Sequence, residues 1–335
     1  KEILDSISRH KLRTTLTALG VFWGIFMLVL LLGAGTGLSN GVEHEFRDDA
    51  INSIWISPGT TSKVWKGLPE GRRLKLTNRE FDLLSSLEEV EHITGRYYPP
   101  GGDKTVTFAD NRLSFPLRSV HPGHEQLENT RVTNGRYINE QDLKAYRKVA
   151  VVGNRVREDL FGDVDPIGRE ITIGDAVFRV VGLYEDTGSD YETRIIYIPV
   201  TTAQKMNGGT QRLHRIMFTT GEISLERANA LEEEVRLLLA NRLQFDPADR
   251  RAVWVNNRAE EYRSIQNLLA MIRGFVWLVS LGSIFAGAIG ISNIMLIVVN
   301  DRTREIGLRK AMGATPGSII SMVLSEAILI TVVAG

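Results

Sequence analysis

The sequence of 335 residues predicts an α-helical transmembrane protein that carries a large α+β extracytoplasmic domain. Two stretches without Asp, Glu, Lys or Arg, residues 14–42 and 274–300, have the length and apolar character of membrane-spanning helices. All 40 basic and 40 acidic side chains lie outside these two stretches. The roughly 230 residues between the stretches are too many for a loop, and they contain both strand-like and helix-like hydrophobic patterns.

The composition excludes several classes of protein. A net charge of zero argues against a nucleic-acid-binding protein, which needs a basic excess to neutralise phosphates. The absence of cysteine excludes disulfides, thiolate metal sites and thiol catalysis. The sequence has no Gly-x-x-x-x-Gly-Lys-Ser/Thr loop and no catalytic or metal-ligand constellation. We therefore expect no catalytic site, metal site or cofactor in this chain.

Three apolar segments are predicted to lie in the membrane. The first covers residues 16–38 and the second residues 274–299, and each is long enough to cross about 30 Å of hydrocarbon. A third begins at residue 318 and continues to residue 335, interrupted only by Glu326. Because the chain begins at Lys1 rather than Met and ends inside this segment, we expect it to be part of a longer polypeptide.

The basic residues predict the orientation. Lys1, Arg9, Lys11 and Arg13 precede the first span, and Arg302, Arg304, Arg309 and Lys310 follow the second. Acidic residues dominate just after the first span. Since basic residues favour the cytoplasmic side, the N-terminus and residues 300–317 are predicted to be cytoplasmic and residues 39–270 to lie outside. The basic residues Arg258, Arg263 and Arg273 before the second span weaken this asymmetry.

The outside domain is predicted to contain two subdomains, one inserted in the other. Thr77 and Glu80 have the spacing of a capping box, and Ser224 can begin a helix that runs to about Arg242. Residues 170–182 resemble a hairpin that turns at Gly174. Strand–helix–strand patterns at both ends predict an outer subdomain of residues 45–115 and 215–258. The strand-rich residues 116–214 form the predicted inserted subdomain.

The cytoplasmic loop of residues 300–317 is predicted to contain a short amphipathic helix. Residues 302–312 combine apolar side chains with basic ones, Gly313 can end the helix, and Thr315-Pro316 can begin the next. Such a helix suits docking to a cytoplasmic partner. An ordinary positively charged loop is the alternative, and the residues alone do not decide between them.

Several polar and small residues inside the spans are expected to have structural or functional roles. Asn293 is expected to make an interhelical hydrogen bond. Glu326 either pairs with a neighbouring helix or takes part directly in transport. Gly287 and Gly290 belong to small-xxx-small pairs, which allow helices to approach closely in lipid.

The loop sequence resembles the hallmark of FtsX/MacB-type permeases of ABC transporters, also called type VII or mechanotransmission transporters. The stretch is Arg302-Thr-Arg-Glu-Ile-Gly-Leu-Arg-Lys-Ala-Met-Gly-Ala314. The segments Val149-Ala-Val-Val-Gly-Asn154, Leu160-Phe-Gly162 and Asp165-Pro-Ile-Gly168 are similar to the MacB-like periplasmic core domain. The resemblance implies that residues 1–15 form a cytoplasmic amphipathic helix. It also implies that the coupling residues are Arg302, Arg304, Glu305, Gly307, Arg309, Lys310 and Gly313.

The resemblance implies a function and partners. The chain would transmit the motions of a cytoplasmic ABC ATPase, which binds ATP and Mg, to the outside domain and so drive efflux. It would lie in the bacterial inner membrane as a homodimer or heterodimer of permeases, with a periplasmic adaptor and an outer-membrane channel as further partners. Lipoprotein release and regulation of cell-wall hydrolases are alternatives within the superfamily. A membrane-anchored extracytoplasmic sensor or receptor is the alternative from another class.

Overall fold

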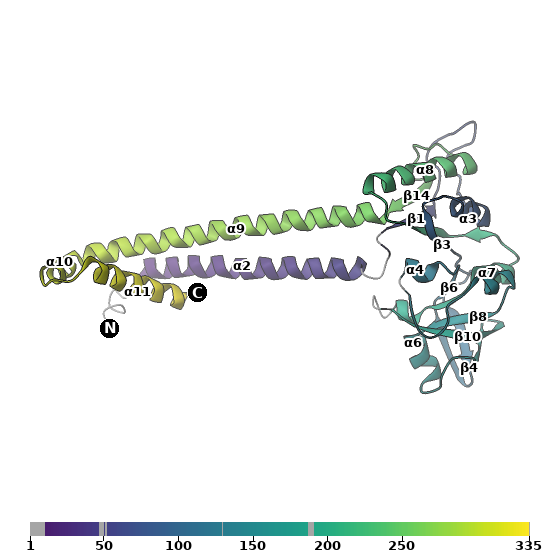
Figure 1. Cartoon of the computed structure of the whole chain (residues 1–335), viewed down its shortest axis with the longest axis horizontal. Helices are drawn as coiled ribbons and strands as arrows, with labels where there is room; N and C mark the ends of the chain where they lie inside the picture. Colours follow the sequence, from purple (N-terminus) through teal and green to yellow (C-terminus); the bar gives the residue numbers. More distant parts are fainter. Residues whose placement is uncertain (1–10, 47–49, 51, 129, 187–190, 335) are drawn as a thin grey trace. The chain divides into compact units, whose positions relative to one another are not determined.

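The structure is a computed structural model that describes residues 11–46, 50, 52–128, 130–186 and 191–334. Its residues divide into two compact units, which are described separately here. One consists of Lys1–Gly41 with Gln266–Gly335, and the other of Val42–Ile265. Figure 1 identifies the elements by label and by sequence colour. The predicted helix of residues 1–15 falls mainly on residues 1–10, outside the described residues.

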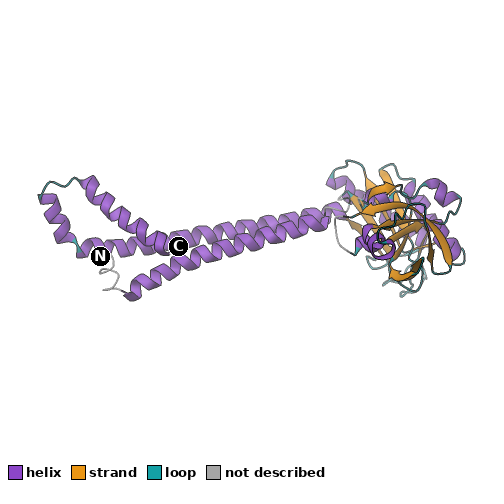
Figure 2. Ribbon diagram, turned by 90° about the horizontal axis from the view of Figure 1, so that it is seen from below, coloured by secondary structure: helices purple, strands orange, loops and turns teal. Residues whose placement is uncertain are grey.

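The first unit consists of helices (Figure 2). They are α2 (Lys11–Phe46), α9 (Arg258–Asp301), α10 (Thr303–Ala311) and α11 (Pro316–Ala334), of which α2 and α9 also extend into the second unit. By length and composition, Phe22–Gly41 and Arg258–Ile289 qualify as membrane spans among the described residues, and Pro316–Ser325 is a shorter apolar helix. The predicted spans of residues 16–38 and 274–299 therefore each lie within a longer helix.

Helices α2 and α9 approach each other closely at one pair of small residues. A Cβ atom added to Gly24 of α2 would lie 3.1 Å from the Cβ of Ser283 on α9. This distance is tighter than most side-chain contacts, so the absent side chain permits the approach. Small residues play the same role in helix pairs within lipid.

A four-stranded antiparallel sheet organises one part of the second unit. Its order is β14 (Val253–Asn257), β1 (Ser53–Pro58), β13 (Arg215–Thr220) and β3 (Val90–Arg96). Ile54 and Ile56 of β1 alternate with half-buried neighbours and belong to the main core. Leu231 and Val235 of helix α8 (Leu225–Leu243) are buried in the same core cluster. The sheet thus has one face that packs against apolar side chains.

A larger mixed sheet contains eight strands. Its order is β5 (Asn111–Phe115), β4 (Lys104–Phe108), β9 (Glu170–Ile173), β10 (Ala176–Glu185), β8 (Val149–Gly153), β11 (Ile196–Pro199) and β6 (Leu117–Val120), and β7 (Arg131–Gly135) pairs with β10. β10 runs parallel to β8, and β11 runs parallel to β6. The short strands β2 (Leu76–Thr77) and β12 (Arg212–Leu213) pair separately.

Short helices cover or connect these sheets. They are α3 (Asn78–Ser85), α4 (His124–Leu127), α5 (Glu140–Lys144), α6 (Asn154–Val156), the π-helical turn η1 (Arg157–Phe161), the 3₁₀ turn η2 (Glu192–Arg194) and α7 (Val200–Met206). The capping box of Thr77 and Glu80 is present at α3, and Ser224 caps α8. The predicted hairpin turns at Gly174, whose φ of +58° is the left-handed backbone that glycine tolerates.

One subdomain boundary differs from the prediction. The prediction places residues 104–115 in the outer subdomain. Their two strands belong instead to the eight-stranded sheet, where Val106 lies opposite Ile173 of β9. Hydrophobic periodicity indicates that a segment is a strand but does not identify its partner strand, so the pattern of residues 104–115 does not show which sheet they join. A single core cluster contains residues of both sheets, and the division into two subdomains stays a prediction.

Candidate coupling site

The predicted coupling helix is present as α10, immediately after α9. Thr303 joins the two helices, because its Oγ1 donates to the carbonyl oxygens of Val299 at 3.1 Å and Asn300 at 2.8 Å. These carbonyls lie at the end of α9, where intrahelical donors run out. Glu305 lies in the first turn of α10, and Arg309 and Lys310 lie in the last. This charge order is favourable for the helix dipole.

Gly313 ends α10 through a Schellman motif. Its φ is +95°, its N–H donates to Lys310 O at 3.2 Å, and Ala314 N–H donates to Arg309 O at 3.0 Å. These two bonds satisfy carbonyls that the helix leaves without partners. Pro316 then begins α11, as predicted, and the Oγ1 of Thr315 accepts from Ser318 N–H at 3.4 Å. The turn between α10 and α11 is therefore defined by local chemistry.

The surface of α10 combines apolar and basic side chains. No residue of α10 is buried by the described part of the chain, and Leu308 is 65% exposed. Met312, its C-cap residue, is 73% exposed. Exposed apolar groups flanked by Arg304, Arg309 and Lys310 suit a protein partner that offers an apolar cleft with an acidic rim. Arg302, Gly307 and Glu305 lie on the same short helix or at its N-cap, so the predicted coupling residues are contiguous.

The other end of α9 is joined directly to the four-stranded sheet. Strand β14 ends at Asn257 and α9 begins at Arg258, so no linker residue separates them. The Oδ1 of Asn257 accepts from Ala259 N–H at 3.1 Å, and its Nδ2 donates to Asn229 of α8 at 2.8 Å. The guanidinium of Arg258 lies 4.3 Å from the ring centroid of Trp55 on β1. Cation–π contact and capping together stabilise this strand-to-helix junction.

The same junction is braced from the side of α8. Arg236, which is almost fully buried, donates from Nη1 to the carbonyl of Val253 in β14 at 2.9 Å. It also pairs with Glu232 one turn earlier at 3.3 Å. A buried guanidinium held at both ends restricts movement of β14 relative to α8. The first turn of α9 is therefore attached to a well-supported strand.

A buried polar network connects the two sheets. Arg96 of β3 pairs with Glu128, which also lies 3.3 Å from Arg118 Nη1 on β6. Arg118 in turn makes a two-bond contact with Glu192, at 2.7 Å and 2.9 Å. These two arginines and two glutamates balance one another in charge, and they lie between positions 96 and 192 of the chain. Such a network resists relative displacement of the sheets, because separating one partner leaves a buried charge.

His124 is the neutral centre of this network. Its Nε2 lies 3.3 Å from Arg96 Nε and 3.1 Å from Arg96 Nη2, and Nδ1 lies 3.3 Å from Tyr137 Oη. Burial and the nearby guanidinium groups of Arg96 and Arg118 hold the pKa of His124 well below its usual value. The neutral ring accepts from Arg96 at Nε2, which assigns its proton to Nδ1.

The polar and small residues predicted inside the spans have varied surroundings. Asn293 lies on α9 and is exposed, so its interhelical bond stays a prediction. Gly287 and Gly290 also lie on α9, and Glu326 lies on α11. The surroundings of Gly290 and Glu326 fall outside what the structure describes. Both alternatives for Glu326 stay predictions.

The junction and the buried network were missed at the sequence level. The order Asn257-x-x-Glu260 is a recognisable helix start and could have located the beginning of α9 at residue 258. No comparable local signal exists for the two longer-range pairs of the network, because Arg96–Glu128 and Arg118–Glu192 lie 32 and 74 positions apart. Only the sheet topology brings these side chains together.

Comparison with known families agrees with this arrangement. Residues 14–236 match the MacB-like periplasmic core domain, which is two thirds of the chain. Residues 277–335 match the FtsX-like permease C-terminal family. The chain belongs to the MacB/FtsX-type permeases. The second match covers residues 277–301 of α9 together with α10 and α11, and the first match covers every described strand of the two sheets except β14.

Curated relatives cover the whole chain. A macrolide export ATP-binding/permease protein MacB of Wolinella succinogenes is 28% identical over 100% of this chain and 51% of its own length. A pyoverdine export ATP-binding/permease protein PvdT of Pseudomonas syringae pv. tomato is 31% identical over 100% of this chain and 50% of its own length. The chain thus spans about half the length of the relatives it matches.

Two solved structures share the fold of the domain. The periplasmic region of MacB from Actinobacillus actinomycetemcomitans matches with a TM-score of 0.54 at 16% identity, covering 68% of this chain and 98% of that one. The extracellular domain of the noncanonic ABC-type transporter YknZ from Gram-positive bacteria gives 0.51 at 17% identity, covering 62% and 100%. These matches confirm the α+β fold predicted for the extracytoplasmic domain. Permeases of this family are inner-membrane proteins with a periplasmic domain.

Proposed function

We propose that this chain is the permease part of an ABC exporter and transmits the motions of a cytoplasmic ATPase to its periplasmic domain. The ATPase binds ATP and Mg and performs the hydrolysis, while this chain contributes no catalytic group. The relatives named for macrolide and pyoverdine export support export as the direction of transport. Lipoprotein release and control of cell-wall hydrolases are the alternatives within the superfamily.

The continuity of α9 carries this proposal. One helix of 44 residues, about 66 Å at 1.5 Å per residue, begins directly after the last residue of a sheet strand and ends just before α10. A span needs only about 20 residues. In this proposal, a displacement at α10 is transmitted along the continuous helix. The Asn257 and Trp55 contacts attach its other end to the four-stranded sheet.

The same reasoning assigns the partners. The exposed apolar and basic surface of α10 would dock in a cleft of the ATPase. Two permeases, identical or different, would act together in the inner membrane, so that closure of two ATPases brings the two periplasmic domains together. A periplasmic adaptor and an outer-membrane channel would then receive the exported substrate.

A distance measurement between two permeases tests the proposal. Because these 335 residues contain no cysteine, Val177→Cys introduces a spin-label site that is unique within them, at a half-exposed position of β10. In the complete transporter, we expect the label-to-label distance to change when a slowly hydrolysed ATP analogue binds. An unchanged distance in a preparation with normal ATPase activity would sink the proposal. The same label measured without the ATPase provides the control.

A further inference from the structure

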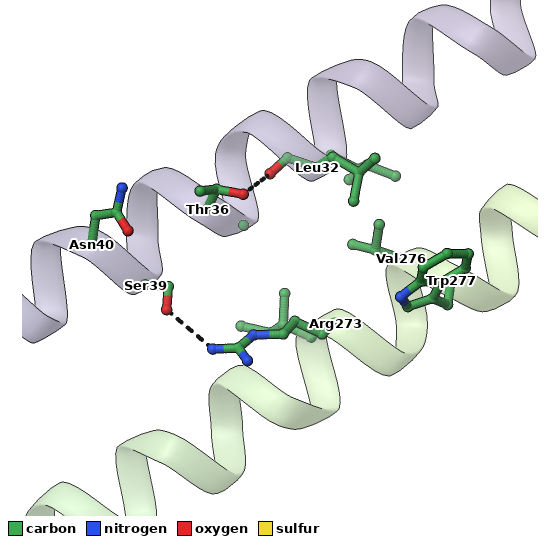
Figure 3. A pocket seen from close by; sticks show the side chains of 10 residues that line it. Leu32, Thr36, Ser39, Asn40, Arg273, Val276 and Trp277 are labelled. Carbon is green, nitrogen blue, oxygen red and sulfur yellow. Dashed lines mark hydrogen bonds between the residues drawn. The ribbon is translucent and has the colours of Figure 1, made fainter.

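A groove between α2 and α9 combines an apolar wall with one cationic side chain. It has a volume of about 230 Å³ and is lined by residues that include Leu32, Gly35, Ser39, Arg273, Val276 and Trp277. Figure 3 shows the side chains of Leu32, Ser39, Arg273 and Val276 on the sides of the two helices that face each other. All of them belong to the helical unit, so the groove does not depend on how the two units are arranged.

The polar end of the groove is formed by Arg273 and its neighbours. Arg273 Nη2 donates to Ser39 Oγ at 3.1 Å, and Asn40 also lines this end (Figure 3). Within the part of the chain that the structure describes, Arg273 has no carboxylate within ion-pair distance. Arg273 is also the last charged residue before the charge-free residues 274–300. A guanidinium in this position presents a planar set of donors that matches a phosphate.

The apolar end of the groove continues along the same helices. Trp277 lies one helical turn after Arg273 and is 66% exposed. Leu32 and Val276 provide an aliphatic wall, and a Cβ built on Gly35 would meet no atom of another described segment within 4 Å. A Trp one turn from an Arg at the edge of a charge-free segment is typical of the level where a membrane meets water. The groove therefore offers an anion site and a hydrocarbon surface in direct succession.

We propose that this groove binds a phospholipid of the extracytoplasmic leaflet. Arg273 and Ser39 hold its phosphate, and the first part of one acyl chain follows Leu32 and Val276. The inference rests on the membrane placement in the proposed function. A free phosphate would leave the apolar wall without a partner. The volume is smaller than a typical drug-sized pocket, which suits a headgroup and the start of one chain.

Native mass spectrometry of the full-length permease in detergent tests this inference. Three probes are added separately: phosphatidylglycerol, diacylglycerol with the same chains, and inorganic phosphate. We expect only phosphatidylglycerol to remain bound. Arg273→Gln should weaken its retention about tenfold, the effect of losing a charge-assisted hydrogen bond. Arg263→Gln, an exposed arginine on α9 outside the groove, is the matched control and should retain the lipid as the unchanged protein does.

A second variant separates occupancy of the groove from loss of charge. Gly35→Leu fills open space on a helix and favours the helical backbone, so it should preserve the fold while displacing the acyl chain. We expect it to lower phosphatidylglycerol retention as well. Equal losses in Arg263→Gln and Arg273→Gln, equal binding of diacylglycerol, or full competition by inorganic phosphate would each overturn the inference. The assay uses no nucleotide, so its failure is distinguishable from a failure of ATP-driven transmission.

Discussion

Replacing Glu128 with Gln should destabilise the periplasmic domain far more than an exposed substitution of the same kind. Glu128 is buried and faces two guanidinium groups, those of Arg96 and Arg118. Glu128→Gln leaves Arg118 with Glu192 but removes the carboxylate partner described for Arg96. Breaking one partner of a buried pair typically costs about 3–5 kcal/mol.

The expected loss can be measured as a melting temperature. A domain of about 200 residues loses about 2–4 °C for each kcal/mol, so Glu128→Gln should melt about 6–20 °C lower. The isolated domain is a suitable sample, because Val42–Ile265 forms one compact unit of the chain. Circular dichroism at neutral pH follows the unfolding.

Glu170→Gln is the matched control. Glu170 pairs with Arg179 at 3.4 Å, but the two side chains are 60% and 64% exposed, and exposed pairs contribute about 0–1 kcal/mol. The control should melt within about 4 °C of the unchanged domain. Equal shifts for the two variants would refute the assignment of the network as a stabilising link between the sheets. The double variant Arg96→Met/Glu128→Gln should lose less than the sum of its single changes, since it removes the unpaired charge.

Three further predictions concern pH, a turn and the docking surface. Burial lowers the pKa of His121 to about 4, and its Nδ1 accepts from Gly95 N–H at 2.9 Å. The ring of the unfolded chain protonates near pH 6.5. The contribution of His121 to the free energy of unfolding should therefore be constant above that pH and fall as the pH drops towards 4. Urea unfolding should show a shallower fall for His121→Gln, and an unchanged slope would contradict this. Gly174→Val should cost about 1–2 kcal/mol in the same assay because φ is +58°, and Gly174→Asn should cost less; equal costs would exclude backbone strain as the cause. Leu308→Asp should weaken co-purification of the ATPase about tenfold, whereas Leu237→Asp, a half-exposed change on α8, should not; normal recovery with Leu308→Asp would remove α10 from the interface.

Local sequence signals predicted the features that depend on neighbouring residues. The Thr77–Glu80 capping box, the Ser224 cap and the Gly313 stop all correspond to hydrogen bonds within a few positions. The apolar stretches likewise located α2 and α9 because hydrophobic length is a local property. The helices extend beyond those stretches, however, because polar residues such as Glu260 and Glu261 continue a helix without being apolar.

Features that depend on distant residues could not be predicted in the same way. The hairpin of residues 104–115 joins β9, some 60 positions later, and its own alternation does not name that partner. The network of Arg96, Glu128 and Arg118 exists only once β3 and β6 are placed. The groove at Arg273 requires α2 and α9 to pack together, and its Ser39–Arg273 contact joins residues 234 positions apart. Each of these is a consequence of tertiary pairing rather than of local propensity.

Interrupting the junction between β14 and α9 tests the central claim most directly. An insertion of Gly-Ser-Gly-Ser between Asn257 and Arg258 keeps both elements but places a flexible link between them. The same insertion between Gly208 and Gly209, a turn in which both residues have positive φ, is the control. With the Val177→Cys label, transmission through α9 predicts that the junction insertion abolishes the ATP-dependent distance change while ATP hydrolysis continues, and that the control retains it. A full distance change across the interrupted junction would contradict the account.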